Sequence, residues 1–459
     1  MDRNEIERIN NVQKSFYESG KTFSYESRIE KLDRLYSSIE KYSEKLKKAL
    51  KIDLCKAEQE SEMCEIGLTL SEITYVKKHL KKWMKEKKVH TPLSQFASSS
   101  FIRPLPYGNV LIMSPWNYPV LLTLEPLCDA LAGGNTVILK PSQYSKETTT
   151  VLKEMIEETF REEEVALIEG GREENSALLD INFDYIFFTG SKEVGKIVMA
   201  KASEHLTPVT LELGGKSPVF VTENASIELA CKRIVFGKLI NAGQTCVAPD
   251  YILVDEKVKD ELQNALINEI RNQVGSDALQ NSEYGKIINE KHFKRILGLI
   301  NSDKIVYGGR SDEKTLKIEP TVLANVNEDD SIMKEEIFGP IFPIISYKTL
   351  DDAIKYVKKN EHPLALYVFT NKRKEADYIM KNTLFGGGCI NDTLVHLATS
   401  SMGFGGVRES GIGSYHGKNG FDTFSHYTSI LDKKRFIDLP MRYRPYSDKK
   451  RKLIKIFLK

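Results

Sequence analysis

Apolar positions recur three and four residues apart through most of the first 90 residues of the chain. Lys and Glu occupy many of the positions between them, so each segment has an apolar face and a charged face. This spacing is typical of amphipathic helices. The clearest examples are Ile29, Leu32, Leu35, Tyr36 and Ile39, and the stretch Ile66–Met84. Residues 1–90 are therefore predicted to be helical.

The pattern changes at Asn109, where short apolar runs begin to alternate with helix-like stretches. The runs are nearly continuous in apolar residues, as are strands buried on both faces of a parallel sheet. They are Val110–Met113, Thr136–Leu139, Val165–Ile168 and Tyr185–Phe188, and the stretches between them include Ser145–Phe160 and Lys192–Ser203. This alternation predicts an α/β fold with a doubly wound sheet, whose strands end at a nucleotide-binding edge.

A second alternating region follows, and we place the boundary between the two regions near Leu211–Gly215. The strand-like runs of this second region are Pro218–Val221, Tyr251–Val254, Pro343–Ser346 and Leu364–Phe369. Its helix-like stretches are Ile227–Ile240, Lys257–Val274 and Leu350–Lys359. The sequence therefore predicts two α/β regions in succession.

Two further segments interrupt this alternation. Leu93–Ser100 is polar and rich in serine, and Pro104 and Pro106 follow it, so we expect a connection or an exposed excursion there. Phe421–Ile430 alternates aromatic residues with Thr and Ser, which predicts a late strand. Such a strand could extend a sheet, a partner subunit's sheet included.

The composition is that of an ordinary globular protein too long for a single core. Of 459 residues, 41% are hydrophobic and 28% charged, so two or three domains are expected. The net charge of +2 removes the global electrostatic argument for nucleic-acid binding. The charged N-terminus lacks the apolar stretch of a secretory signal, and no run reaches the roughly 18 apolar residues of a membrane helix. We therefore expect a cytoplasmic protein.

Cys246 stands out among six cysteines that are scattered along the chain. No pair forms a CxxC and no His lies at ligand spacing, so neither a disulfide scaffold nor a zinc site is predicted. Cys246 follows Gly243, Gln244 and Thr245, on a segment that we expect to be reachable. A nucleophilic thiolate needs a polar or positive environment. Taken alone, however, such a Cys is more often structural.

Glu212 lies between two leucines at the predicted end of a strand. The simple interpretation is a surface carboxylate. The functional interpretation is a carboxylate in a partly apolar site, where its pKa is raised and it can act as a general base. Gly214 and Gly215 follow it and would let the backbone approach a ligand closely.

Asn117 lies in the segment Ser114–Pro119, directly after the first strand of the doubly wound sheet. Two prolines fix this backbone, and Trp116 and Tyr118 anchor it. An Asn held in this way can direct its side-chain N–H at a developing oxyanion. A simple proline-rich turn is the alternative.

Two more segments could hold parts of a nucleotide. Lys140 is placed at the carboxyl end of a buried strand, where it could reach an adenosine ribose or phosphate. Glu335 and Glu336, with Phe338 after them, could hold a nicotinamide ribose and ring. The alternative for each segment is an ordinary strand end or loop.

Six motifs occur in order along the chain: PWNYP, LKPS, FFTGS, LELGGKSP, GQTCVAPD and EEIFGP. Together they resemble the motifs of the aldehyde dehydrogenase superfamily. The segment FGGVRESGIGSYHGKNGFDTFSH and the short N-terminus are similar to the class 3 branch, which acts on fatty and aromatic aldehydes. The resemblance extends from about residue 100 to residue 430. It implies a Rossmann-like cofactor domain, a second α/β catalytic domain and a small β oligomerisation element.

The resemblance also implies a division of the chain. Residues 1–90 and 107–211 would form the NAD(P)-binding domain, and residues 212–391 the catalytic domain. Residues 91–106 and 392–435 would form the bridging and oligomerisation element, and residues 436–459 a basic amphipathic tail. A homodimer is expected on the same ground.

The site residues are carried over position by position. Cys246 is similar to the family's nucleophile, Glu212 to its base and Asn117 to its oxyanion-hole donor. Lys140 and Glu336 match the residues that hold the two riboses, and Phe338 matches the aromatic residue near the nicotinamide. The remaining cofactor contacts implied are Trp116, Ser142, Gln143, Thr189, Gly190, Ser191, Gly195, Leu213 and Gly214. No metal is expected.

The resemblance implies oxidation of an apolar aldehyde with NAD or NADP and water. Cys246 would form a thiohemiacetal and then a thioester, and Glu212 would activate water to release the acid. One rival is an acylating enzyme that passes the thioester to coenzyme A, against which Glu212 argues. Another rival is a protein without catalysis on the same fold.

Gln143 departs from many relatives, which carry Glu three residues after the Lys. That Glu binds the adenosine 2′-hydroxyl in those relatives and would repel a 2′-phosphate, whereas neutral Gln would not. We therefore predict that the enzyme tolerates NADP beside NAD.

The C-terminal segment Arg442–Lys459 is strongly basic, with apolar residues between its charges. We favour a short helix over the substrate entrance or a solvated tail. The alternative is weak docking to an anionic membrane surface.

Overall fold

The N-terminal region is a layer of helices, as predicted, in a computed structural model that describes residues 2–458. The helices are α1 (Arg3–Glu18), α2 (Tyr25–Leu54), α3 (Glu58–Ser61) and α4 (Gly67–Trp83), with a π-helical turn, η1 (Glu62–Ile66), before α4. The helical prediction is wrong for Lys87–Val89, which form strand β1, because they pair antiparallel with the segment around Phe101.

The first sheet has six strands in the order β17-β7-β6-β3-β4-β5. They are β3 (Asn109–Met113), β4 (Thr136–Lys140), β5 (Val165–Leu167), β6 (Tyr185–Thr189), β7 (Val209–Glu212) and the short antiparallel β17 (Gly411–Ile412). Its helices are α5 (Leu121–Gly133), α6 (Lys146–Thr159), α7 (Arg172–Leu179) and α8 (Lys192–His205). The order reverses between β3 and β6, which is where doubly wound sheets bind nucleotides.

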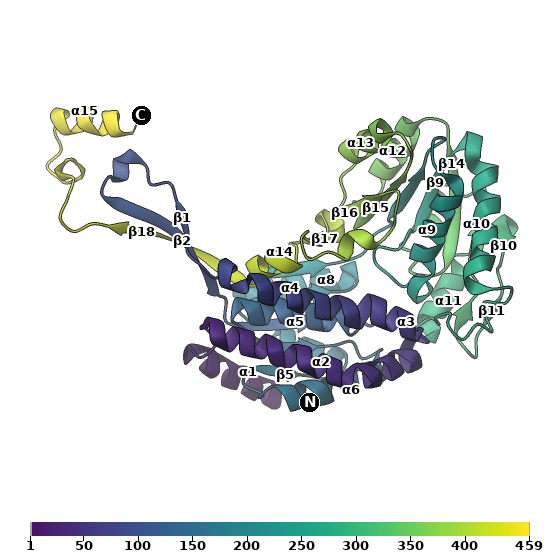
Figure 1. The fold of residues 1–459 in the computed structure, drawn as a ribbon, viewed down its shortest axis with the longest axis horizontal. Helices are drawn as coiled ribbons and strands as arrows, with labels where there is room; N and C mark the ends of the chain where they lie inside the picture. Colours follow the sequence, from purple (N-terminus) through teal and green to yellow (C-terminus); the bar gives the residue numbers. More distant parts are fainter. Residues whose placement is uncertain (1, 459) are drawn as a thin grey trace.

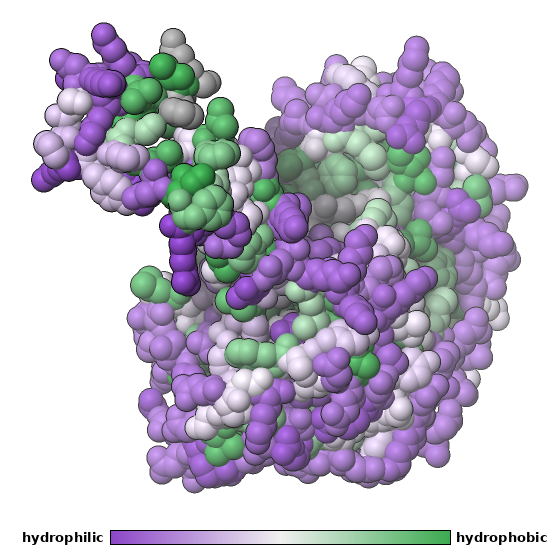
Figure 2. Space-filling model, turned by 60° about the vertical axis from the view of Figure 1, so that its left-hand side comes forward, coloured by the Kyte–Doolittle hydropathy of each residue, from purple (hydrophilic) through white to green (hydrophobic). Residues whose placement is uncertain are grey.

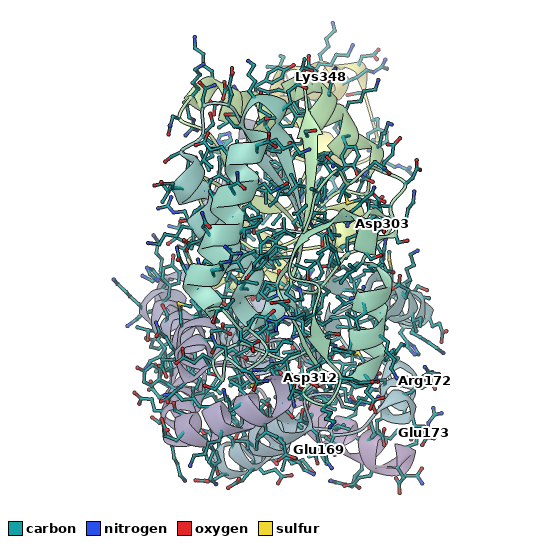
Figure 3. The ribbon with its side chains drawn as sticks, turned by 90° about the vertical axis from the view of Figure 1, so that its right-hand side faces the viewer. Glu169, Arg172, Glu173, Asp303, Asp312 and Lys348 are labelled. Carbon is teal, nitrogen blue, oxygen red and sulfur yellow. The ribbon has the colours of Figure 1, made fainter. Side chains whose placement is uncertain are left out.

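The second sheet has seven strands in the order β10-β13-β14-β9-β8-β15-β16. They are β10 (Ile305–Tyr307), β13 (Thr321–Leu323), β14 (Ile341–Tyr347), β9 (Tyr251–Asp255), β8 (Pro218–Val221), β15 (Ala365–Phe369) and β16 (Gly387–Ile390). Its helices are α9 (Ile227–Leu239), α10 (Lys259–Val274), α11 (Glu290–Gly298), α12 (Leu350–Lys359) and α13 (Arg373–Asn382), and a small hairpin is formed by β11 (Ser311–Asp312) and β12 (Lys317–Ile318). Figure 3 shows this second region, with Asp303 and Lys348, above the first, with Glu169 and Arg172.

A three-stranded arm extends from the body of the molecule (Figure 1). It consists of β1 (Lys87–Val89), β2 (Ser98–Pro106) and β18 (Ser425–Lys433), and it carries α15 (Asp448–Phe457) at its far end. The late strand was predicted to begin at Phe421, but that residue belongs to α14 (Gly417–Thr423). The difference has a packing cause, because Phe421 and Phe424 are anchors that lie against Trp83 and Phe187 at centroid distances of 5.7 Å.

Both faces of the first sheet are buried, which explains its continuous apolar strands. Val110 and Ile112 belong to a large core that also contains the second sheet, whereas Leu111 and Met113 belong to a smaller core with α1 and α8. No helix among residues 2–458 is long and apolar enough to cross a membrane.

Candidate active site

The two sheets meet around one apolar cavity of about 290 Å³. Glu212 comes to it from the end of β7 and Tyr118 from the loop after β3. Cys246 comes from the turn after η3 (Ile240–Gly243) in the second region. The apolar lining is Met63, Cys64, Leu68, Leu121, Leu122, Phe236, Ile240, Val247, Leu394, Val395, Leu397 and Phe404. The structure thus gathers around one cavity groups that lie far apart in the sequence.

Cys246 is half-buried, and its surroundings keep the thiol protonated. Burial raises its pKa to about 12, and the negative charges of Glu336 and Glu212 add to the rise. The backbone N–H of Val247 acts in the opposite direction. This setting differs from the polar or positive one expected from the sequence, because an apolar cavity and two carboxyl groups surround the sulfur.

The turn before Cys246 has an unusual backbone. Asn241 and Ala242 have φ of 51°, and Gly243 has φ of 78°. A Cβ on Gly243 would lie 2.4 Å from the Gly339 carbonyl oxygen, so this position has no room for a side chain. Gln244 braces the turn: its side-chain amide donates to the carbonyls of Asn241 at 3.0 Å and Lys286 at 2.9 Å.

Asn117 is held against this turn. Its side-chain nitrogen donates to the backbone carbonyl of Gln244 at 2.9 Å, and the residue is only 3% exposed. The neighbouring Tyr118 hydroxyl hydrogen-bonds the Thr245 hydroxyl at 2.7 Å. An amide nitrogen carries two N–H groups, so one of them is left for a ligand beside Cys246.

Glu212 is buried without a polar partner. The residue is 2% exposed, and neither carboxyl oxygen has a hydrogen-bond partner among the described residues. Desolvation raises its pKa well above the ordinary value for Glu. A buried carboxyl group that no protein atom satisfies is one that awaits water or a ligand.

Glu336 lies close to Gly214, and its charge acts on the Cys246 thiol. Burial, and then the charge of Asp250, raises the pKa of Glu336 to about 8. A Cβ on Gly214 would lie 2.1 Å from a Glu336 oxygen, so a side chain there would displace the Glu336 carboxyl group. Phe338, with a φ of 51°, packs edge-on against Trp116 at a centroid distance of 5.5 Å.

Sequence reasoning missed the ion pair that joins these loops. Lys216 pairs with Asp250 at 2.5 Å and donates to the carbonyls of Ile332 at 2.9 Å and Glu335 at 2.8 Å. Asp250 in turn accepts from the Ile337 N–H at 2.9 Å. Lys216 is a charged residue of the motif LELGGKSP, and Asp250 is a charged residue of the motif GQTCVAPD. That charge was the available signal.

The expected nucleotide contacts line the carboxyl ends of the first sheet. Lys140 donates to the carbonyls of Pro141 at 2.8 Å and Gly170 at 2.7 Å, and burial lowers its pKa to about 8. Beside it, Gln143 is exposed, and its side-chain oxygen lies over Gly171, where a Cβ would approach to 2.3 Å. Ser142 accepts from the Tyr144 N–H at 3.3 Å.

The turn after β6 lies at the same end of the first sheet. The Thr189 hydroxyl is buried without a partner among the described residues, and the Gly190 N–H donates to the Glu212 carbonyl at 3.0 Å. Ser191 caps α8, and Gly195 packs on Leu213, where a Cβ would lie 2.7 Å from the leucine side chain. An unsatisfied hydroxyl, a helix N-terminus and close backbone approach together fit a dinucleotide.

A second polar group at the cavity was also missed. His416 lines the cavity and pairs with Glu125 at 3.3 Å. The Glu72 carboxylate, which also lines the cavity, accepts from the Gly417 N–H at 2.6 Å. Between residues 2 and 458, no group of three or more His, Cys, Asp or Glu side chains is arranged to hold a metal ion.

Comparison with known proteins gives full-length matches. A model of the aldehyde dehydrogenase family matches residues 1–430. A Staphylococcus aureus protein named 4,4'-diaponeurosporen-aldehyde dehydrogenase is 48% identical over 98% of this chain and 100% of its own length. The Mus musculus protein named aldehyde dehydrogenase, dimeric NADP-preferring, is 42% identical over 93% of this chain and 94% of its own. A solved structure of the substrate-bound state of Staphylococcus aureus AldH is 47% identical, with a TM-score of 0.96 over 99% of each chain.

Proposed function

Because this chain belongs to the aldehyde dehydrogenase family and oxidises aldehydes to carboxylic acids with NAD or NADP, we propose that it does so through a thioester on Cys246. The observation that carries the proposal is the shared cavity. Cys246 and an unpartnered Glu212 line it together, and Asn117 is fixed on the carbonyl of the residue two before the thiol.

The first step forms a bond between the Cys246 sulfur and the aldehyde carbon, and the proton of the thiol passes to a water molecule. The carbonyl oxygen becomes an oxyanion, which the free N–H of the Asn117 amide and the backbone N–H of Cys246 stabilise. Loss of one such donor typically raises the barrier by roughly 3–4 kcal/mol.

The nicotinamide, when bound, accepts the hydride that leaves the former aldehyde carbon. Lys140 and Glu336 would hold the two riboses, and Phe338 would contact the nicotinamide ring. Thr189 and Ser191 would lie on the turn beside the phosphates. Ser142, Gln143, Gly190, Gly195, Leu213 and Gly214 complete this side. The support for these roles is the burial of Lys140, the unpartnered hydroxyl of Thr189 and the close packing at Gly195 and Gly214.

Glu212 acts in the last step. It takes a proton from a water molecule, whose oxygen attacks the thioester carbon, and the carbon–sulfur bond then breaks to release the acid. A raised pKa makes a carboxylate a stronger base once it has lost its proton. A buried carboxyl group without a partner among the described residues therefore suits hydrolysis, and it argues against transfer of the acyl group to coenzyme A.

We propose an apolar medium- or long-chain aliphatic or aromatic aldehyde as substrate. The support is the apolar lining of the cavity and the name of the bacterial relative. A panel of aldehydes from acetaldehyde to dodecanal, with benzaldehyde, tests this with each cofactor. We expect kcat/KM to rise with chain length and product to form without coenzyme A. A strict requirement for coenzyme A would favour the acylating alternative instead.

We also propose that the enzyme is a homodimer. The arm strand β18 extends away from its own body, and β16 is an edge strand of the second sheet (Figure 1). Figure 2 shows a hollow with hydrophobic walls between the arm and the second region. The name of the mouse relative adds support. Light scattering after gel filtration should give twice the chain mass, and loss of residues 425–459 should give the monomer.

A last proposal concerns α15. Figure 1 places it at the tip of the arm, away from the body whose two sheets carry the cavity residues, so it does not cover that cavity. Ile456 and Leu458 are 69% and 73% exposed among basic residues, a combination suited to an anionic membrane surface. Anionic vesicles should co-sediment the full chain but not a chain that lacks residues 442–459. Equal sedimentation of both chains would contradict this proposal.

A further inference from the structure

Lys56 and Glu65 form an ion pair inside the protein, and neither belongs to the motifs identified in the sequence. Both side chains are 0% exposed. Lys56 follows Cys55, whose left-handed φ of 54° ends α2. Glu65 lies in η1, where the Gly67 N–H donates to the Glu62 carbonyl five residues earlier. Turns of this π type are uncommon and occur frequently at functional sites.

This ion pair forms hydrogen bonds with both ends of the loop that begins with Asn117. Lys56 Nζ donates to the Asn117 backbone carbonyl at 3.1 Å and lies 4.1 Å from the centroid of the Tyr118 ring. The Glu65 carboxylate accepts from the backbone N–H groups of Val120 at 2.8 Å and Leu121 at 3.3 Å. The loop and the start of α5 are therefore tied to a single pair of buried charges.

A second contact holds Asn117 from the side of the thiol. The Asn241 side chain donates to the same Asn117 carbonyl at 2.8 Å and to the Gln244 carbonyl at 3.2 Å. Glu60 fixes Asn241 by accepting from its backbone N–H at 3.2 Å. The backbone carbonyl of Asn117 thus accepts two hydrogen bonds, one from Lys56 in the N-terminal region and one from Asn241 in the turn before Cys246. Its side-chain amide donates to the Gln244 carbonyl.

Stability alone gives little reason for such a pair. Two buried charges lose their hydration, and apolar residues of similar size often replace them at no cost in stability. Their specific effect is geometric, because charged hydrogen bonds are short and directional. A catalytic amide needs this kind of fixed support, since a displacement of about 1 Å can cost roughly a hundredfold in rate.

We propose that Lys56 and Glu65 are positioning residues that set the Asn117 amide for the oxyanion. Neither is assigned contact with the substrate. This inference rests on the role of Asn117 in the proposed function. It predicts that the pair matters for catalysis only while Asn117 is present, which separates it from a pair that merely supports the fold.

The test is a double-mutant cycle with Lys56→Met and Asn117→Ala in the full chain. For Lys56→Met alone, we expect kcat for octanal to fall about 10- to 100-fold, with KM for NAD changed less than about threefold. In the Asn117→Ala background the same substitution should change kcat by less than about threefold, because residues that act as a unit are not additive. All rates are measured roughly 15 °C or more below the melting temperature of each variant.

Lys31→Met is the matched control. Lys31 is also buried and lies 3.9 Å from the carboxylate of Glu164, but Lys31 belongs to α2 and Glu164 to the turn before β5, and neither lines the cavity. Its kcat should stay within about twofold of the unmodified enzyme. If Lys56→Met does not fold, Glu65→Gln replaces it, because Gln keeps an acceptor for Val120 while removing the negative charge from Lys56.

Each outcome is decisive. Equal losses of kcat from Lys56→Met in the two backgrounds, or no loss in either, would overturn the positioning role and leave the proposed function intact. If Asn117→Ala alone keeps the full rate, the oxyanion role fails first and the positioning role fails with it. A large loss that disappears in the Asn117→Ala background supports both.

Discussion

The polar groups on the two sides of the active site lie in different surroundings. On the aldehyde side, Cys246 and Glu212 lie in an apolar cavity, and burial raises the pKa of both. On the nucleotide side, Lys140 donates to two carbonyl groups, and Gln143 is exposed. Burial also lowers the pKa of Lys140, so the two sides differ in their chemistry: the groups that we propose to react lie on the aldehyde side, and the exposed Gln143 is placed to distinguish one nucleotide from another. Substitutions on the aldehyde side should therefore have much larger effects than substitutions on the nucleotide side.

Cys246→Ala should have the largest effect of all. Without the sulfur no covalent intermediate forms, so NADH production with octanal should fall to the background rate. Cys231→Ala is the control, because that thiol is a buried side chain of α9 and donates to the Leu262 carbonyl at 3.6 Å. Retained turnover in Cys246→Ala, measured by absorbance at saturating NAD, would remove Cys246 as the nucleophile.

Glu212→Gln should follow, with a loss of about 10²- to 10⁴-fold in steady-state turnover. Gln cannot accept the proton from water, so the thioester forms but is not hydrolysed. Stopped-flow absorbance should show one equivalent of NADH in a burst and then a slow phase. If the burst and the steady rate are both unchanged, the base lies elsewhere.

The pH dependence of Cys246 alkylation tests the buried setting of the thiol directly. Its pKa of about 12 in the free enzyme means that the thiolate fraction rises about tenfold for each pH unit below that value. Alkylation by iodoacetamide, followed on the Cys246 peptide by mass spectrometry, should therefore increase without a plateau from pH 6 to about pH 10. A plateau near pH 7 would show that the surroundings favour the thiolate.

The smallest effect is expected on the nucleotide side. Gln143→Glu adds a negative charge near the position of the adenosine ribose, where it repels a 2′-phosphate. The ratio of kcat/KM for NADP to that for NAD should fall about 10-fold or more, and the rate with NAD should change little. A preference for NAD above about a thousandfold in the unmodified enzyme, roughly 4 kcal/mol, would contradict the proposed tolerance of NADP.

The elements were largely predictable, because each depends on residues that are neighbours in the sequence. Pro218–Val221 and Leu350–Lys359 have the same bounds in the structure as in the prediction. The predicted start of the last strand at Phe421 is wrong, because an aromatic residue that anchors a helix produces the same alternation as one in a strand.

The site was predictable only where a motif carried it. Cys246, Glu212 and Asn117 were singled out, and the structure places them together, but their roles stay predictions. The supporting contacts were not visible: Lys56 reaches Asn117 across 61 residues, and His416 meets Glu125 only through the folded chain. Patterns along a chain indicate which face is buried, but they do not indicate which two buried polar groups will meet.

A thioester on Cys246 should accumulate in the Glu212→Gln enzyme, where it can be detected as a covalent adduct. The protein is mixed with octanal and NAD, quenched in acid after the burst, digested and analysed by mass spectrometry. The peptide containing Cys246 should gain the mass of one octanoyl group, and the peptide containing Cys64 should not. An unmodified Cys246 peptide after a full burst of NADH would contradict a thioester on Cys246.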